Sequence, residues 1–205
     1  MKVFPGPLPP DLDRIRRALA GTQLPERPLE GKQAAVALVL AGGTADLHVC
    51  LIHRAEHEHD RWSGHVALPG GRVDPGDPSA RAAAVRETWE EVGLRLDGSP
   101  CLGSLETQPV SSAGRPTGIS LSSFVFYLGE TLEPFTPSDE VADAFWVPLG
   151  HLLDPQNAAH RPTPRDGAIL QSPAVVYQGR YIWGLTYRVL TIFFEAVQLR
   201  IARPG

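Results

Sequence analysis

Residues 70–94 of the chain read Gly-Gly-Arg-Val-Asp-Pro-Gly-Asp-Pro-Ser-Ala-Arg-Ala-Ala-Ala-Val-Arg-Glu-Thr-Trp-Glu-Glu-Val-Gly-Leu. A glycine turn leads into a predicted helix that carries Arg86, Glu87, Glu90 and Glu91. Three glutamates within five helical positions repel one another, and each like-charge pair costs about 0.2–0.5 kcal/mol without a counter-ion. The cluster therefore predicts a bound cation at this point of the fold.

The charged and apolar residues of this segment fall on different faces of the predicted helix. At about 100° per residue, one apolar stripe is formed by Ala82, Val85, Trp89 and Val92. Glu87 lies three positions before Glu90 and four before Glu91 on the opposite face, so the three carboxylates can reach one point. Converging carboxylate oxygens suit a hard divalent ion such as Mg²⁺ or Mn²⁺. A merely solvated acidic face is the alternative, and it is disfavoured because the glycine turn, the capping residues and the stripe occur together.

Both ends of the helix carry capping signals. Asp77 is the predicted N-cap, with Pro78 at the first helical position, where its missing N–H is harmless. Gly93 suits the left-handed position after the last turn. Upstream, the apolar run 66–68 predicts a strand, and Pro69-Gly70-Gly71 predicts a tight loop. We expect the order strand, loop, acidic helix, with the loop backbone close to the metal.

The segment resembles the Nudix box, a pattern of Gly, five residues, Glu, seven residues, Arg-Glu, an apolar residue, any residue, Glu-Glu, any residue, Gly and an apolar residue. Residues 86–94 match its second half, with Thr88 at the apolar position. In the first half, the spacing from Gly71 to Arg86 is one residue longer, and Asp74 or Asp77 stands where Glu is expected.

The resemblance covers roughly residues 34–195 and implies a fold and a chemistry. The implied fold is α/β, a Nudix-type α/β/α sandwich with a mixed β-sheet. The implied activity is hydrolysis of the diphosphate linkage of a nucleoside diphosphate derivative, a small-molecule substrate, with Mg²⁺ or Mn²⁺. We expect two parts, an N-terminal arm with a short helix (1–33) and the hydrolase domain (34–205).

The opening Gly-Gly-x-x-Asp-Pro-x-Asp at residues 70–77 is similar to the coenzyme A pyrophosphatase branch of this family. Residues 51–54, 63–71 and 182–186 also resemble that branch, as does Glu140-Val141. The implied substrate is coenzyme A or an acyl-coenzyme A, giving phosphopantetheine and adenosine 3′,5′-bisphosphate. ADP-ribose is an alternative, because Pro109 lies near where that branch carries a proline. A non-catalytic nucleotide-binding module is a further alternative, but it should have lost box acids, and all three are present.

Diphosphate hydrolysis implies specific roles for the glutamates and for Arg86. A divalent ion held by Glu87, Glu90 and Glu91 would neutralise the diphosphate and lower the pKa of a bound water. Arg86 is expected to orient the acids by pairing with one of them. The general base is Glu90, Glu91 or Glu140, and Glu140 could instead be an exposed turn acid.

Other polar residues lie close to the turn in sequence. Gly70 and Gly71 could supply a carbonyl ligand or let phosphates approach without a side chain in the way. Arg54 ends a predicted strand and could meet a phosphate, such as the 3′-phosphate of coenzyme A, or form a surface salt bridge. The spacing of four nearby histidines fits no common zinc site, and no cysteine joins them; they are His53, His57, His59 and His65.

Composition agrees with a small cytoplasmic enzyme. The chain has 205 residues, enough for one domain with a sizeable core. Its net charge of -4 gives no general attraction for nucleic acid or an anionic membrane. No apolar run approaches the length of a membrane span. Cys50 and Cys101 lie in apolar surroundings and are expected to be reduced. The apolar residues of the arm, with the family resemblance, suggest a homodimer.

The remaining elements are expected as follows. A short helix is predicted around Asp11–Ala20, and a closing helix over Leu185–Ile201. Strands are predicted at 34–40, 47–54, 102–107 and 120–128, the last two separated by a loop around 111–116. Short helical turns at Val141–Phe145 and Leu149–Leu153 flank a strand at 146–147. Residues 156–173 are predicted to form a long surface loop, followed by a hairpin of 175–177 with 181–183.

Overall fold

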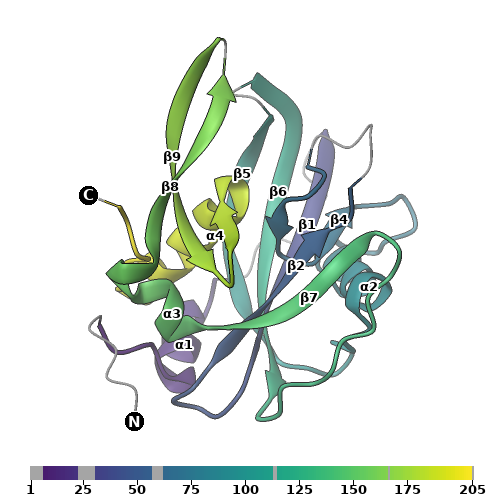
Figure 1. Ribbon diagram of the computed structural model, residues 1–205. Coiled ribbons are helices and arrows are strands. Elements are labelled where there is room, and N and C mark those ends of the chain that lie inside the picture. The colour runs from purple at the N-terminus through teal and green to yellow at the C-terminus, as the bar shows by residue number, and fades with distance from the viewer. Residues whose placement is uncertain (1–6, 23–30, 57–61, 113–114, 166, 205) are drawn as a thin grey trace.

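The computed structural model describes residues 7–22, 31–56, 62–112, 115–165 and 167–204 (Figure 1). Within them, a seven-stranded sheet has the order β3-β2-β1-β6-β5, with β4 paired to β1 and β7 to β2. Its strands are β1 (Lys32–Ala41), β2 (His48–Arg54), β3 (Val66–Ala67), β4 (Gly70–Arg72), β5 (Cys101–Ser112), β6 (Arg115–Gly129) and β7 (Val141–Pro148). The β1 and β6 strands run parallel, and the other pairs are antiparallel. The predicted mixed sheet is therefore confirmed.

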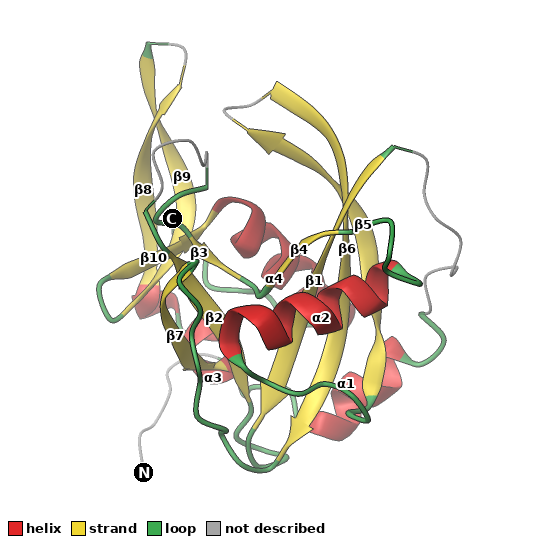
Figure 2. Cartoon of the chain, turned by 90° about the vertical axis from the view of Figure 1, so that its right-hand side faces the viewer, coloured by secondary structure: helices red, strands yellow, loops and turns green. Residues whose placement is uncertain are grey.

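Helices cover both faces of this sheet. The helix α2 (Ala80–Val92) lies on one face, and α4 (Gly184–Ala196) lies on the other together with α1 (Leu12–Leu19) and α3 (Leu149–Leu153) (Figure 2). Successive residues of β1 point to opposite sides: Leu38 and Leu40 join the core under α4, whereas Ala37 and Val39 join the core under α2. The architecture is the predicted α/β/α sandwich.

A second, antiparallel sheet stands beside the first one. Its order is β10-β9-β8, and its strands are β8 (Ala158–Arg165), β9 (Ala168–Tyr177) and β10 (Arg180–Trp183). The 3-10 turn η1 (Pro155–Asn157) connects α3 to β8. The β10 strand contacts β3, at the edge of the main sheet. This contact places the second sheet next to the glycine turn that follows β3.

The helix predicted near the N-terminus is present and belongs to the main core. Leu12, Ile15 and Leu19 of α1 are buried in the same cluster as the apolar residues of α4. Asp11 caps the helix by accepting a hydrogen bond from the Arg14 N–H at 2.7 Å. The apolar face of α1 is thus covered within the chain. The homodimer stays a prediction without support from these side chains.

Three predicted segments differ from the structure. Residues 141–145 form the first part of β7 rather than a helical turn, because they pair with β2 from Arg54 to Leu51. The loop expected around 111–116 lies largely in β5 and β6, which pair as far as Ser112 and Arg115. The loop expected over 156–173 is mostly the β8–β9 hairpin. In each case a partner strand supplies the backbone hydrogen bonds, and that partner cannot be identified from the local sequence.

The other predicted elements agree more closely. The hairpin of β9 and β10 turns at Gln178 and Gly179, as predicted. The closing helix ends at Ala196, earlier than the predicted Ile201. Cys50 and Cys101 are both free thiols. Among the described residues, no helix has the length and apolar character needed to cross a membrane.

Candidate active site

The acidic helix begins later than the sequence predicted. Its N-cap is Ser79, whose Oγ accepts a hydrogen bond from the Ala82 N–H at 3.1 Å. The prediction of Asp77 as N-cap was wrong, because that carboxylate is engaged by Arg86. The C-terminal end is as predicted: Gly93 has a φ of 73° and closes the last turn.

The buried face of α2 is also rotated from the predicted stripe. Trp89 is 47% exposed, with the Arg95 guanidinium carbon 4.3 Å above its ring. The buried side instead contains Ala83, Ala84, Thr88, Glu91 and Val92. The Thr88 hydroxyl donates to the Ala84 carbonyl at 2.7 Å, which lets a polar residue occupy a buried position. Glu91 consequently points towards the sheet with a side chain only 5% exposed.

The glycine turn packs directly against two of the acids. Gly70 has a φ of 144°, and a Cβ there would lie 2.2 Å from the Ala35 carbonyl oxygen. A Cβ on Gly71 would lie 2.5 Å from the carboxylate carbon of Glu87. The Gly70 N–H donates to Glu91 Oε2 at 2.8 Å. Both glycines thus make room for close contact between the turn and the acidic helix.

Arg86 donates hydrogen bonds to three carboxylates, and a fourth, Asp74, lies 3.7 Å away. Its Nη1 donates to Glu87 Oε1 at 3.0 Å and to Glu90 Oε2 at 2.8 Å. Its Nε and Nη2 donate to the two oxygens of Asp77 at 3.0 and 2.9 Å. These bonds hold the pKa of Asp77 below its usual value. The guanidinium therefore joins the loop before α2 to the acids on α2.

Arg54 and Glu140 approach the cluster from other elements. Arg54 Nη1 lies 3.7 Å from Glu91 Oε1, so its ion pair involves a buried acid of the cluster. The backbone carbonyl of Glu140 accepts the Ala55 N–H at 2.9 Å, which holds the loop before β7 beside the end of β2. Burial is the main cause of the raised pKa of both Glu87 and Glu91, and the charge of nearby Glu140 adds to it. All six charged residues named for the site thus lie in one region: Arg54, Arg86, Glu87, Glu90, Glu91 and Glu140.

Two of the acids have raised pKa values. Burial raises the pKa of Glu91 to about 7, although the Gly70 N–H and Arg54 act in the opposite direction. Burial also raises the pKa of Glu87, against the effect of Arg86. The positive charges of Arg54 and Arg86 therefore do not offset the cost of burying the Glu87 and Glu91 carboxylates. A divalent cation would supply the missing positive charge, and carboxylate oxygens are the donors that Mg²⁺ and Mn²⁺ prefer.

The acids are not yet gathered around one point. In the part of the chain that the structure describes, no group of three or more Asp, Glu, His or Cys side chains is arranged to hold a metal ion. Arg86 Nη1 lies between Glu87 and Glu90, and Glu91 Oε2 is bound to the Gly70 N–H. Metal binding requires these carboxylates to turn from their present partners, which their several rotatable bonds allow. The donor set fits the ion, and the side chains must adjust.

The histidines have other partners. His53 Nε2 lies 3.0 Å from the Gly64 carbonyl oxygen, and the His65 ring lies against Trp183 with centroids 4.8 Å apart. His57 and His59 lie outside the described residues. Neither His53 nor His65 belongs to a group of side chains arranged to hold a metal ion.

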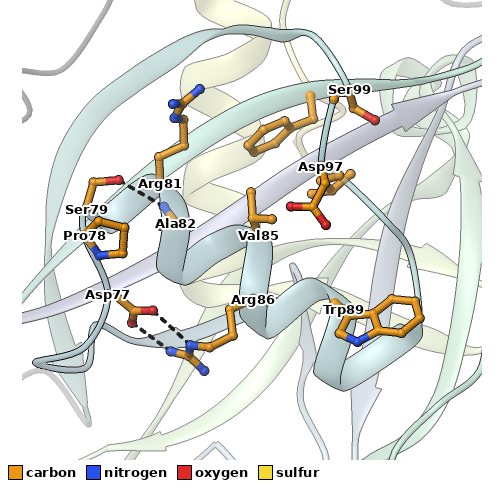
Figure 3. A pocket seen from close by; sticks show the side chains of 13 residues that line it. Asp77, Pro78, Ser79, Arg81, Ala82, Val85, Arg86, Trp89, Asp97 and Ser99 are labelled. Carbon is orange, nitrogen blue, oxygen red and sulfur yellow. Dashed lines mark hydrogen bonds and ion pairs between the residues drawn. The ribbon is translucent and has the colours of Figure 1, made fainter.

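A groove of about 870 Å³ runs along the outer side of α2. Figure 3 shows Asp77 and Arg86 in its wall, joined by their two hydrogen bonds, and Trp89 at one end. Val85 faces this groove, whereas Glu91 lies on the buried side of the helix. Arg86, which lines the groove, also donates to the Arg72 carbonyl of β4 at 3.3 Å.

The model of the NUDIX domain family matches residues 31–166. The human mitochondrial coenzyme A diphosphatase NUDT8 is 33% identical over 196 residues, which are 94% of this chain and 78% of that protein. An uncharacterized protein of Schizosaccharomyces pombe is 43% identical over 117 residues, 53% of this chain and 34% of that protein. The crystal structure of a MutT/nudix family protein from Enterococcus faecalis has a TM-score of 0.51 and 19% identity, covering 86% of this chain and 65% of that one, and it bears on the fold alone.

Proposed function

This chain belongs to the NUDIX family of pyrophosphohydrolases, and we propose that it cleaves the diphosphate linkage of coenzyme A or an acyl-coenzyme A. The products are phosphopantetheine, or its acyl form, and adenosine 3′,5′-bisphosphate. The observation that carries the hydrolytic activity is the packing of Glu87 and Glu91 against Gly71 and Gly70. The substrate assignment is supported by the 33% identity to a coenzyme A diphosphatase over 94% of this chain.

The family generally uses divalent metal ions, and the acids of α2 provide the donors. Glu87, Glu90 and Glu91 would hold Mg²⁺ or Mn²⁺, which when bound neutralises diphosphate charge and lowers the pKa of a bound water. Arg86 orients Glu87 and Glu90 through its Nη1 rather than contacting the substrate. Its second contact, to Asp77, fixes the guanidinium on the helix.

The chain's own residues position the substrate. Gly70 and Gly71 leave the turn without side chains, so a phosphate can approach its backbone. Arg54 is the proposed ligand of the diphosphate oxygens, and its 24% exposed side chain, 3.7 Å from Glu91, supports this role. The Gly70 N–H and the Arg54 guanidinium contact different oxygens of the Glu91 carboxylate, Oε2 and Oε1.

Glu140 is the proposed general base. Glu91 is buried and Glu90 is held by Arg86, whereas Glu140 is exposed beside both Glu87 and Glu91. The oxygen of the attacking water bonds to one phosphorus, the bridging P–O bond breaks, and the Glu140 carboxylate takes the proton. Glu90 and Glu91 are the alternatives that substitution must exclude.

The ADP-ribose alternative receives less support. It was based on Pro109, which lies in β5 opposite Ser120. The β5 strand is separated from β4, which carries the glycine turn, by β6 and β1. A cytoplasmic location stays a proposal, and so does the absence of nucleic-acid or membrane partners, for which the net charge of -4 gives support.

A substrate panel tests the proposal. The protein is incubated with Mg²⁺ or Mn²⁺ and, separately, coenzyme A, ADP-ribose, NADH and dinucleoside polyphosphates, and initial rates of diphosphate cleavage are measured. We expect the highest kcat/KM for coenzyme A or an acyl-coenzyme A. Consumption of ADP-ribose with coenzyme A left intact would overturn the substrate assignment while leaving the hydrolase intact.

A further inference from the structure

A row of contacts leads from the acids to the second sheet. Arg54, which pairs with Glu91 at 3.7 Å, donates its backbone N–H to the His65 carbonyl at 3.0 Å. The His65 ring lies against the Trp183 ring with centroids 4.8 Å apart. The guanidinium carbon of Arg161 lies 3.9 Å from the centroid of the Trp183 ring. Arg161 thus stands at the outer end of a continuous path that begins at the catalytic acids.

The backbone fixes both ends of this path. The β2 and β3 strands pair with His53 opposite Val66, which brings His65 beside Arg54. Trp183 ends β10, and it is held there because the buried Thr186 donates its hydroxyl to the Val66 carbonyl at 2.9 Å. Figure 2 shows the second sheet beside β3, with α2 in front of the main sheet. The position of Trp183 is thus set by the strand that leads into the glycine turn.

Arg161 is held in place by an aromatic ring rather than by an acid. The side chain is partly exposed, and within the described ranges no carboxylate pairs with it. A guanidinium stacked on an aromatic ring keeps its N–H groups free to bind a carboxylate or phosphate through two parallel bonds. The stack also reduces the conformational freedom that the side chain loses on binding. Arg161 therefore has the properties of a prearranged anion-binding group.

We propose that Arg161, held on Trp183, binds a second phosphate of the substrate, a phosphomonoester separate from the diphosphate that is cleaved. For coenzyme A this group is the 3′-phosphate, and that identification rests on the proposed function. Arg54 was one candidate for this phosphate from the sequence, but its ion pair with Glu91 favours the proposed role at the diphosphate. In this proposal Arg54 binds the diphosphate and Arg161 binds the phosphomonoester. Arg161 therefore determines the selectivity for substrates that carry the second phosphate.

Kinetics with a matched pair of substrates test the proposal. Coenzyme A and dephospho-coenzyme A differ only in the 3′-phosphate, so their kcat/KM ratio measures recognition of that group. Arg161→Gln should lower kcat/KM for coenzyme A by about 10- to 100-fold, mainly through KM, and leave dephospho-coenzyme A unchanged. Arg161→Lys should lose less, because it keeps the charge without the planar fork. Arg17→Gln, which removes the same charge from an exposed site on α1, should change neither value.

A Trp183 series tests the aromatic support. Trp183→Leu should reduce the preference for coenzyme A, whereas Trp183→Phe should retain most of it, since a ring remains under Arg161. Circular dichroism shows whether each variant is folded. If Trp183→Leu does not fold, the result for Arg161→Gln alone tests the proposal. Equal losses for both substrates in Arg161→Gln, or an unchanged coenzyme A value, would overturn the role of Arg161.

Failure of the proposed function gives a different result. If the native protein cleaves neither coenzyme A nor its dephospho form, the substrate assignment fails and Arg161 is tested with ADP-ribose and ADP-ribose 2′-phosphate. A preference for the phosphorylated compound that Arg161→Gln abolishes would support the phosphomonoester site. Equal kcat/KM values for the two compounds in the native protein would overturn it.

Discussion

The backbone N–H of Gly70 donates a hydrogen bond to Glu91 Oε2 at 2.8 Å, and this bond joins the glycine turn to the acidic helix. The next residue, Gly71, leaves the space that the Glu87 carboxylate occupies. Two acids are therefore positioned by the backbone of β4, and the third, Glu90, is positioned by Arg86. The arrangement of the cluster depends on the turn as much as on the helix.

Gly71→Ala should impair activity far more than folding. The new Cβ would meet the end of the flexible Glu87 side chain at 2.5 Å, so the carboxylate moves while the backbone remains. We expect a loss of about 100-fold in kcat/KM, the scale for a misplaced catalytic group, with little change in the melting temperature. Gly76→Ala is the control, because a Cβ there meets nothing within 4 Å.

Gly70→Ala should instead destabilise the fold. Its Cβ would lie 2.2 Å from the Ala35 carbonyl oxygen and 2.6 Å from the Val36 Cα, and its φ is 144°. Neither backbone atom can turn aside as a side chain does. Thermal unfolding should show a large drop in melting temperature, and a native-like value would contradict this description of the turn.

Asp77→Asn should lower turnover through Arg86. The substitution keeps the shape of Asp77 but weakens its two bonds to the guanidinium, which holds Glu87 and Glu90. We expect a loss of about 10- to 100-fold in kcat, the usual effect of residues that orient metal ligands. Asp74→Asn is the control, since Asp74 is 66% exposed and 3.7 Å from Arg86. Equal effects of the two substitutions would argue against the role of Asp77.

The raised pKa of Glu91 predicts a pH-dependent stability without metal. Its pKa in the folded chain is about 7, above the ordinary value of 4.5, so folding favours the protonated form. The free energy of unfolding should therefore fall as the pH rises between these values, by an amount on the order of 2 kcal/mol. In EDTA, Glu91→Gln should be more stable than the native protein at pH 8, and this advantage should shrink at pH 5. An advantage that is the same at both pH values would contradict the burial of this charge, and Glu90→Gln, at a side chain 54% exposed, is the control.

Substitution of Glu140 identifies the base. Glu140→Gln should lower kcat by about 100-fold or more and remove one ionisation from the pH–rate profile, because general bases contribute on that scale. Its neighbour Asp139 is also exposed, so Asp139→Asn should leave the rate unchanged. If Glu140→Gln retains the native profile, the base must be sought at Glu90 or Glu91.

The acidic helix could be predicted from the sequence because its main signals are local. The glutamate spacing and the end at Gly93 need no knowledge of distant residues. The buried face could not be predicted, because apolar character alone places Trp89 inside and Glu91 outside. The partners of Glu91 come from Gly70 and Arg54, which lie 21 residues and further away in sequence. Tertiary contacts therefore override the sequence pattern at residues of the candidate site.

The long hairpins were missed for a related reason. The β8 strand contains Pro162 and Pro164, and residues of this kind usually indicate loops. Its pairing with β9 runs from Ala158 to Arg165 and is visible only when both strands are placed. The same hairpin brings Arg161 to Trp183, and the local sequence does not predict this contact.

Product analysis with coenzyme A tests the central claim most directly. The native protein and Glu91→Gln are incubated with coenzyme A and Mg²⁺ or Mn²⁺, and phosphopantetheine and adenosine 3′,5′-bisphosphate are quantified by mass spectrometry. We predict that the native protein forms the two products in equal amounts and that the folded variant is slower by orders of magnitude. Intact coenzyme A with the native protein, or equal rates for the two proteins, would contradict the account.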